Sequence, residues 1–174
     1  MGGDWFWAVL VAATGLAVVA GSAALHFAGL TRLDRWCFVQ EEGVRPSAAA
    51  LAVLGVMLLH LLQILAFGVL FWWVSQWPGG GVVDPGGDPG LLDAIYLSAL
   101  NYSTLGLGGD LSPEGPIRML VAVESLFGLL SITWSASFTY HRLSRGFPGH
   151  QPDGRSAQAL GLERRTDARV GIHS

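Results

Sequence analysis

The chain has 174 residues, of which 51% are hydrophobic and 13% are charged, and its formal net charge is -3 at pH 7. Soluble domains carry roughly 25% charged residues, so this composition excludes an ordinary water-soluble protein. Three apolar stretches, at 5–30, 48–77 and 117–140, reach the ~20 helical residues that cross a hydrocarbon core about 30 Å thick. The sequence therefore predicts an all-α membrane protein with three transmembrane helices.

The arginines predict the orientation of these helices. The chain has no lysine, and its ten arginines fall almost entirely in two regions. These are Arg32, Arg35 and Arg45 between the first two stretches, and Arg142, Arg145, Arg155, Arg164, Arg165 and Arg169 after the third. Because cytoplasmic loops are enriched in basic residues, both regions are expected in the cytoplasm. The N-terminus and residues 78–116 then lie outside a plasma or inner cell membrane.

The first apolar stretch is expected to stay in the mature protein. It has no positive region before it, and its apolar run exceeds the usual 7–15 residues of a signal peptide. Ala13, Ala17 and Gly21 recur four residues apart on it, a spacing that lets helices approach closely in lipid.

Histidines occur on two of the predicted helices. His60 and Gln63 lie three residues apart, hence on one face of the second helix, where we favour an interhelical hydrogen bond over a proton or ion relay. A membrane enzyme would need His26, His60 and Glu124 to form one metal or acid–base site. They fall on three different helices and at different depths, so we expect no enzyme.

A short apolar segment follows the Pro/Gly/Asp-rich outer loop 78–90. Residues 91–102 are apolar enough to enter the membrane, but about 12 helical residues rise only ~18 Å and cannot cross it. The chain must therefore turn back along Ser103–Asp110, which is rich in glycine. Non-helical backbone at membrane depth survives only when protein buries it or it lines a water-filled cavity. This pattern predicts a re-entrant pore helix and loop.

Cation conduction explains the residue types of this loop. A dehydrated cation needs several carbonyl oxygens that point at one axis, and Gly106 and Gly108 permit the left-handed backbone that turns successive carbonyls the same way. Thr104 adds a hydroxyl at the inner end. The C-terminus of the preceding short helix carries a partial negative charge, which favours a cation below it.

The segment ALNYSTLGLGGDLSPEGPIRMLVAVESLFG resembles the pore region of potassium channels, especially small bacterial channels and second pore loops of two-pore-domain channels. In that family a T-V-G-Y-G filter binds K⁺ through backbone carbonyls. The resemblance implies an ion-conducting filter Thr104, Leu105, Gly106, Leu107 and Gly108, with K⁺ held at Thr104, Leu105, Gly106 and Leu107. It also implies filter support from Ser103, Gly109 and Asp110, and a gating hinge at Gly128.

Two residues depart from the family pattern. Leu107 stands where the family usually has Tyr or Phe, so the aromatic packing that braces the filter is missing. Gly109 intervenes before Asp110, which the family places directly after the second glycine. A weakly selective monovalent cation channel, conducting Na⁺ as well as K⁺, is therefore an alternative.

The third membrane helix has one stripe of polar and small side chains, at Glu124, Gly128, Ser131, Ser135 and Thr139. Two interpretations stay open: Ser131, Ser135 and Thr139 line a central cavity, or the stripe is a close-packed helix interface. Glu124 is predicted to brace the pore helix from behind, and a cation-attracting cavity site is the second choice.

One pore loop per chain cannot close a ring of carbonyls, so we predict a homotetrameric passive channel in the lipid bilayer, without cofactor or nucleic acid. A non-conducting scaffold with a channel fold is the alternative from another class. The expected parts are an N-terminal helix and loop at 1–46, a pore domain at 47–145 and a disordered tail at 146–174. The pore domain comprises an outer helix 48–77, a pore helix 91–102, a filter 103–110 and an inner helix 117–142.

Overall fold

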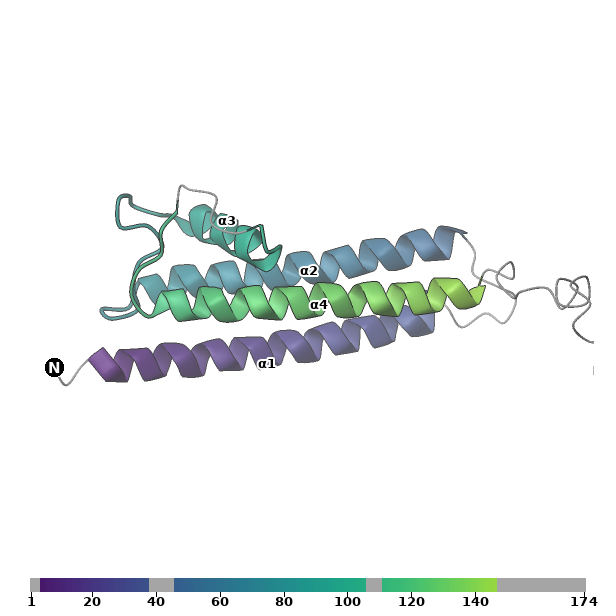
Figure 1. The fold of residues 1–174 in the computed structure, drawn as a ribbon, viewed down its shortest axis with the longest axis horizontal. Coiled ribbons are helices and arrows are strands. Elements are labelled where there is room, and N and C mark those ends of the chain that lie inside the picture. The colour runs from purple at the N-terminus through teal and green to yellow at the C-terminus, as the bar shows by residue number, and fades with distance from the viewer. Residues whose placement is uncertain (1–3, 38–45, 106–110, 147–174) are drawn as a thin grey trace, which may run out of the picture.

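The computed structural model describes residues 4–37, 46–105 and 111–146. Within these ranges it contains four α-helices and no strand: α1 (Asp4–Cys37), α2 (Pro46–Ser75), α3 (Leu91–Tyr102) and α4 (Ile117–Gly146). The helices α1, α2 and α4 are long and apolar enough to cross a membrane. They run alongside one another, and the short α3 lies against one end of the bundle (Figure 1). The predicted all-helical architecture with three membrane-capable helices is confirmed.

The ends of the long helices differ from the predicted ones. α1 continues past residue 30 to Cys37, because residues 31–37 contain neither Gly nor Pro and no turn signal ends the helix there. α4 continues past residue 142 to Gly146. The remainder of the predicted first loop, 38–45, and the predicted tail from 147 onward lie outside the described residues.

Close packing at glycines brings the helices together. A Cβ atom on Gly68 of α2 would lie 2.6 Å from the Cα of Ile95, so α3 contacts α2 at its backbone. In the same way Gly29 of α1 faces the side chain of Leu59 on α2. The row Ala13, Ala17 and Gly21 does not take part, because all three are exposed in the single subunit. Within the subunit, the close contacts of α1 are made at Gly15 and Gly29 instead.

A buried apolar core lies where α3 meets α2 and α4. Its residues include Phe67, Leu70, Phe71, Val74, Ala94, Leu97, Ile117 and Leu120. Burial of such side chains against each other fixes the tilt of α3 relative to the long helices. The pore helix is thus anchored before the chain reaches the predicted filter.

The outer connections on either side of α3 are joined by backbone hydrogen bonds. Val82 N–H donates to Glu114 O over 3.0 Å, and Glu114 N–H donates to Val82 O over 2.9 Å. Gly81 must be glycine here, since its φ is +98° and a Cβ would lie 2.2 Å from Glu114 O. The segment that precedes α3 is therefore held against the segment that precedes α4.

An ion pair joins the other end of α1 to α4. Arg142 Nη2 donates to Asp34 Oδ2, and the guanidinium lies 6.0 Å from the ring centroid of Phe138. The two side chains are 34% and 25% exposed, so the pair is only partly screened by solvent.

Removing one partner of this pair is expected to destabilise the bundle. We predict that Asp34→Asn and Arg142→Gln each lower the stability of the detergent-solubilised protein by about 1 kcal/mol, measured by thermal unfolding. The reversed pair Asp34→Arg with Arg142→Asp should recover part of this loss. Substitution of the exposed Arg35 by Gln is the control. A reversed pair no more stable than the single variants would contradict a specific charge interaction.

Candidate ion-conduction site

The end of α3 turns the chain at the first predicted filter residues. Ser103 N–H donates to Ala99 O over 3.2 Å, and Thr104 N–H donates to Asn101 O over 3.0 Å. Thr104 has a φ of +59°, a left-handed conformation that β-branched residues rarely adopt. The helix α3 therefore ends at Tyr102, and the backbone turns left-handed at Thr104, where the prediction places the inner end of the filter.

The described part of the predicted filter stops at Leu105, whose side chain is exposed in the single subunit. The Ser103 hydroxyl is used within α3, because its Oγ lies 2.7 Å from Ala99 O. The other predicted filter and support residues, Gly106, Leu107, Gly108, Gly109 and Asp110, lie outside the described residues.

Glu124 lies behind the pore helix. Its side chain is fully buried, and its Oε1 lies within hydrogen-bond distance of the Ser98 hydroxyl on α3. The same Ser98 Oγ is 2.8 Å from Ile64 O on α2. Three helices therefore meet at Ser98 and Glu124, on the side of α3 that faces the interior of the subunit.

Gly128 is the point of closest approach between α4 and the end of α3. A Cβ atom at this position would lie 2.3 Å from Tyr102 O and 2.9 Å from Tyr102 Cα. No side chain fits in that space. The predicted hinge residue therefore contacts the backbone that leads into the predicted filter.

A group of polar side chains, all buried except the half-buried His60, connects all four helices, and we call it the polar cluster. It consists of His26 of α1, His60 and Gln63 of α2, Tyr102 of α3 and Ser135 of α4. Gln63 Nε2 donates to Ser22 O over 3.1 Å, and His60 Nδ1 is 2.8 Å from Tyr102 Oη. The predicted interhelical hydrogen bonds of His60 and Gln63 are confirmed.

The two histidines lie closer together than the sequence indicated. The ring centroids of His26 and His60 are 5.4 Å apart, so the expectation that they occupy different depths is wrong for this pair. Sequence position along two antiparallel helices does not reveal where the helices cross. Across the described residues, no three His, Cys, Asp or Glu side chains are grouped as a metal site would require.

The stripe on α4 divides into enclosed and half-buried members. Ser131 and Ser135 are buried within the subunit, and Ser135 Oγ is 3.0 Å from His26 Nε2. The contact of Ser135 with His26 of α1 is of the kind that the helix-interface alternative predicts. The lining of a central cavity by Ser131, Ser135 and Thr139 stays a prediction. Thr139 is half-buried and, together with Ser135, borders a pocket beside His60.

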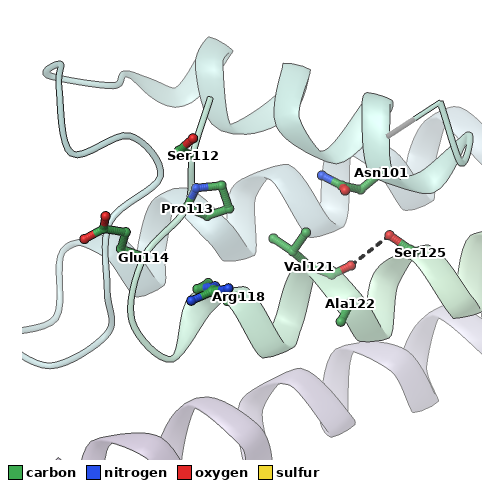
Figure 2. Close-up of a pocket in the computed structure, with 8 residues that line it drawn as sticks. All are labelled: Asn101, Ser112, Pro113, Glu114, Arg118, Val121, Ala122 and Ser125. Carbon is green, nitrogen blue, oxygen red and sulfur yellow. Dashed lines mark hydrogen bonds between the residues drawn. The ribbon is translucent and has the colours of Figure 1, made fainter. Parts of the chain in front are cut away.

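A pocket of about 530 Å³ opens beside the end of α3. It lies between the end of α3, the segment that follows the filter and the first turns of α4 (Figure 2). Its lining residues are Asn101, Ser112, Pro113, Glu114, Arg118, Val121, Ala122 and Ser125. An acidic side chain, Glu114, and a basic one, Arg118, thus border an open surface next to the predicted pore.

Residues 59–145 match the family model described as "Ion channel". The chain belongs to the ion channel family. No curated protein and no solved structure matches it. The matched region includes most of α2, all of α3, the predicted filter and most of α4, whereas α1 lies before it.

This membership agrees with the resemblance to potassium-channel pore domains, and the protein is a multi-pass membrane protein with a passive ion channel domain. Sequence reasoning did not single out Tyr102. Tyr102 follows Ser98 by four residues, so the two lie on one face of α3. This spacing could have indicated that Tyr102 is buried with Ser98.

The contact at Gly128 gives a test of the α3–α4 packing. We predict that Gly128→Ala destabilises the protein by roughly 1–3 kcal/mol, because the added methyl overlaps Tyr102 O. Gly21→Ala is the matched control, since a Cβ on this α1 glycine meets nothing within 4 Å. Thermal unfolding in detergent measures both, and equal stabilities of the two variants would contradict the packing.

Proposed function

We propose that this chain forms a potassium-conducting homotetrameric channel whose filter is the backbone of Thr104–Gly108. The observation that carries the proposal is the short helix α3, which packs against α2 and α4 and ends in a left-handed turn at Thr104. Its C-terminal dipole then favours a cation in the cavity below the filter. The carbonyls of Thr104, Leu105, Gly106 and Leu107 would replace the water of K⁺.

The tetramer follows from the incomplete site in one chain. A single loop supplies one side of a carbonyl ring, so copies related by rotation about an axis complete it. The pocket beside Asn101 and Arg118 is open in the single subunit, which supports a neighbouring copy as its cover. The exposed leucines of α4, among them Leu126, Leu129 and Leu130, offer further apolar surface to neighbours or lipid.

The orientation we propose has the N-terminus and the α3 end of the bundle outside, and the C-terminus in the cytoplasm. Aromatic rings gather at that outer end: Trp7 and Trp77 have centroids 6.2 Å apart, and Trp73 and Trp77 are 5.0 Å apart. Tryptophans prefer the membrane–water interface. The outer loop also carries Asp84 and Asp88, which would concentrate cations near the pore mouth.

Gly128 is proposed as the point about which the inner part of α4 bends during gating. Because it touches Tyr102, a bend there would act on the backbone next to the filter. Thr139, further along α4, is proposed to line the inner cavity. No step in this function is a chemical reaction, so the protein is proposed to act without a cofactor.

Ion flux tests the proposal. We predict that tetramers reconstituted in liposomes carry K⁺ and Rb⁺ faster than Na⁺, and that Gly106→Ala abolishes the flux by blocking the left-handed backbone. Gly86→Ala in the exposed outer loop is the control. Equal flux of K⁺ and Na⁺ would favour the weakly selective channel. No flux of any cation from intact tetramers would favour the non-conducting scaffold.

Glu124 is proposed to brace α3 as a neutral group. The Ser98 hydroxyl has one proton and two nearby acceptors, Ile64 O and Glu124 Oε1, so a protonated carboxyl completes the set by donating to Ser98 Oγ. An uncharged carboxyl also avoids burying a charge at membrane depth.

Two substitutions distinguish bracing from charge attraction. We predict that Glu124→Gln keeps the tetramer and its conductance, because the amide still donates to Ser98. Glu124→Ala should destabilise the protein by roughly 1–3 kcal/mol by leaving Ser98 without this partner. Thermal unfolding and single-channel recording measure the two effects. A lowered conductance in Glu124→Gln, with normal stability, would instead indicate a cation-attracting charge.

A further inference from the structure

Tyr102 occupies the position from which the filter begins. It is the last residue of α3, directly before Ser103, and its side chain is 1% exposed. The hydroxyl of Ser103 bonds back onto α3, and Leu107 has no hydrogen-bonding group in its side chain. Among the described residues at this end of α3, Tyr102 therefore makes the side-chain link from the filter entry to the outer helix α2.

The hydroxyl of Tyr102 has a defined role toward each neighbour. It donates its one proton to Gln63 Oε1, so its contact with His60 Nδ1, at 2.8 Å, is one in which the imidazole N–H donates. Gln63 is oriented in turn, because its Nε2 donates to Ser22 O of α1 over 3.1 Å. A directed chain of hydrogen bonds thus runs from His60 through Tyr102 and Gln63 to α1.

The rest of Tyr102 is held by α4. Its backbone lies against Gly128 with no room for a side chain between them. Its ring meets Phe127 edge-on, with centroids 6.4 Å apart. Tyr102 is thus restrained from two sides: α2 contacts its hydroxyl, and α4 contacts its ring and its backbone. Groups that must be placed to within about 0.5 Å depend on supports of this kind.

The chain of hydrogen bonds also reaches beyond the part of the sequence that the ion channel family model matches. Ser22 and His26 belong to α1, which lies before residue 59. His26 packs beside His60 and contacts Ser135 of α4. The N-terminal helix is therefore connected, through buried polar groups, to the residue that precedes the filter.

We propose that Tyr102 is a positioning residue for the filter: held by Gln63 and His60, it fixes the backbone entering Ser103 and Thr104 and thereby sets the selectivity for K⁺ over Na⁺. This inference rests on the proposed channel function. In this proposal the polar cluster restrains the entry to the filter from outside the pore. The residues of the filter itself do not supply that restraint.

The test compares Tyr102→Phe with Tyr140→Phe, the same change at a tyrosine that is exposed on α4. Bi-ionic recordings from reconstituted tetramers give the permeability ratio of K⁺ to Na⁺. We expect this ratio to fall about two- to tenfold in Tyr102→Phe, the factor that corresponds to one net hydrogen bond, and to stay unchanged in Tyr140→Phe. The K⁺ flux should persist.

A second variant shows whether the effect passes through Gln63. Gln63→Met keeps the side-chain length and removes the acceptor, so it should lower the same ratio. The double variant should then be no worse than the more severe single one, because residues that act through one bond are not additive. If Tyr102→Phe fails to assemble, Gln63→Met alone carries the test.

The unfavourable outcomes are distinct. A permeability ratio equal to wild type in both Tyr102→Phe and Gln63→Met would overturn the positioning role. A lower thermal stability or a lower K⁺ flux with an unchanged ratio would reduce Tyr102 to a structural residue. Wild-type tetramers that do not conduct, or that pass K⁺ and Na⁺ equally, would overturn the proposed potassium channel itself.

Discussion

The structure depends on one constraint: an apolar helix of 12 residues cannot cross a bilayer, and the chain that returns from it must be sheltered. The neighbours of α3 serve that need. α2 and α4 bury one face of the helix, and the Val82–Glu114 bridge joins the segment before α3 to the segment before α4. Gly128 lets α4 approach the point where helix changes to loop.

The N-terminal helix adds a second layer of support. It packs along α2 and α4, and its polar groups at Ser22 and His26 join a cluster that would be costly to bury in isolation. Polar side chains in a membrane bundle pair with one another, so the cluster fixes the relative positions of the helices. The Asp34–Arg142 pair makes a further link at the other end of α1. The helix α1, which lies outside the residues matched by the family model, thus makes polar contacts with the ion channel domain.

Hydropathy and length sufficed to predict the three long helices and the bounds of α3 at 91–102, because transfer into lipid depends on composition. The helical periodicity of polar residues did not indicate which helices pack against each other. It placed Glu124, Gly128, Ser131 and Ser135 on one face of α4, yet which helix meets that face is decided by tertiary packing. For the same reason His26 and His60 were not expected side by side, and the exposed row of Ala13 and Gly21 was assigned to packing.

The most direct test of the central claim is ion density in the filter of the assembled protein, determined first in K⁺ and then in Na⁺. The proposed function predicts a four-fold axis through the loops, with K⁺ density level with the carbonyls of Thr104, Leu105, Gly106 and Leu107, and a changed pattern in Na⁺. An assembly without that axis, or a well-ordered loop without density in either salt, would contradict a carbonyl-lined potassium filter.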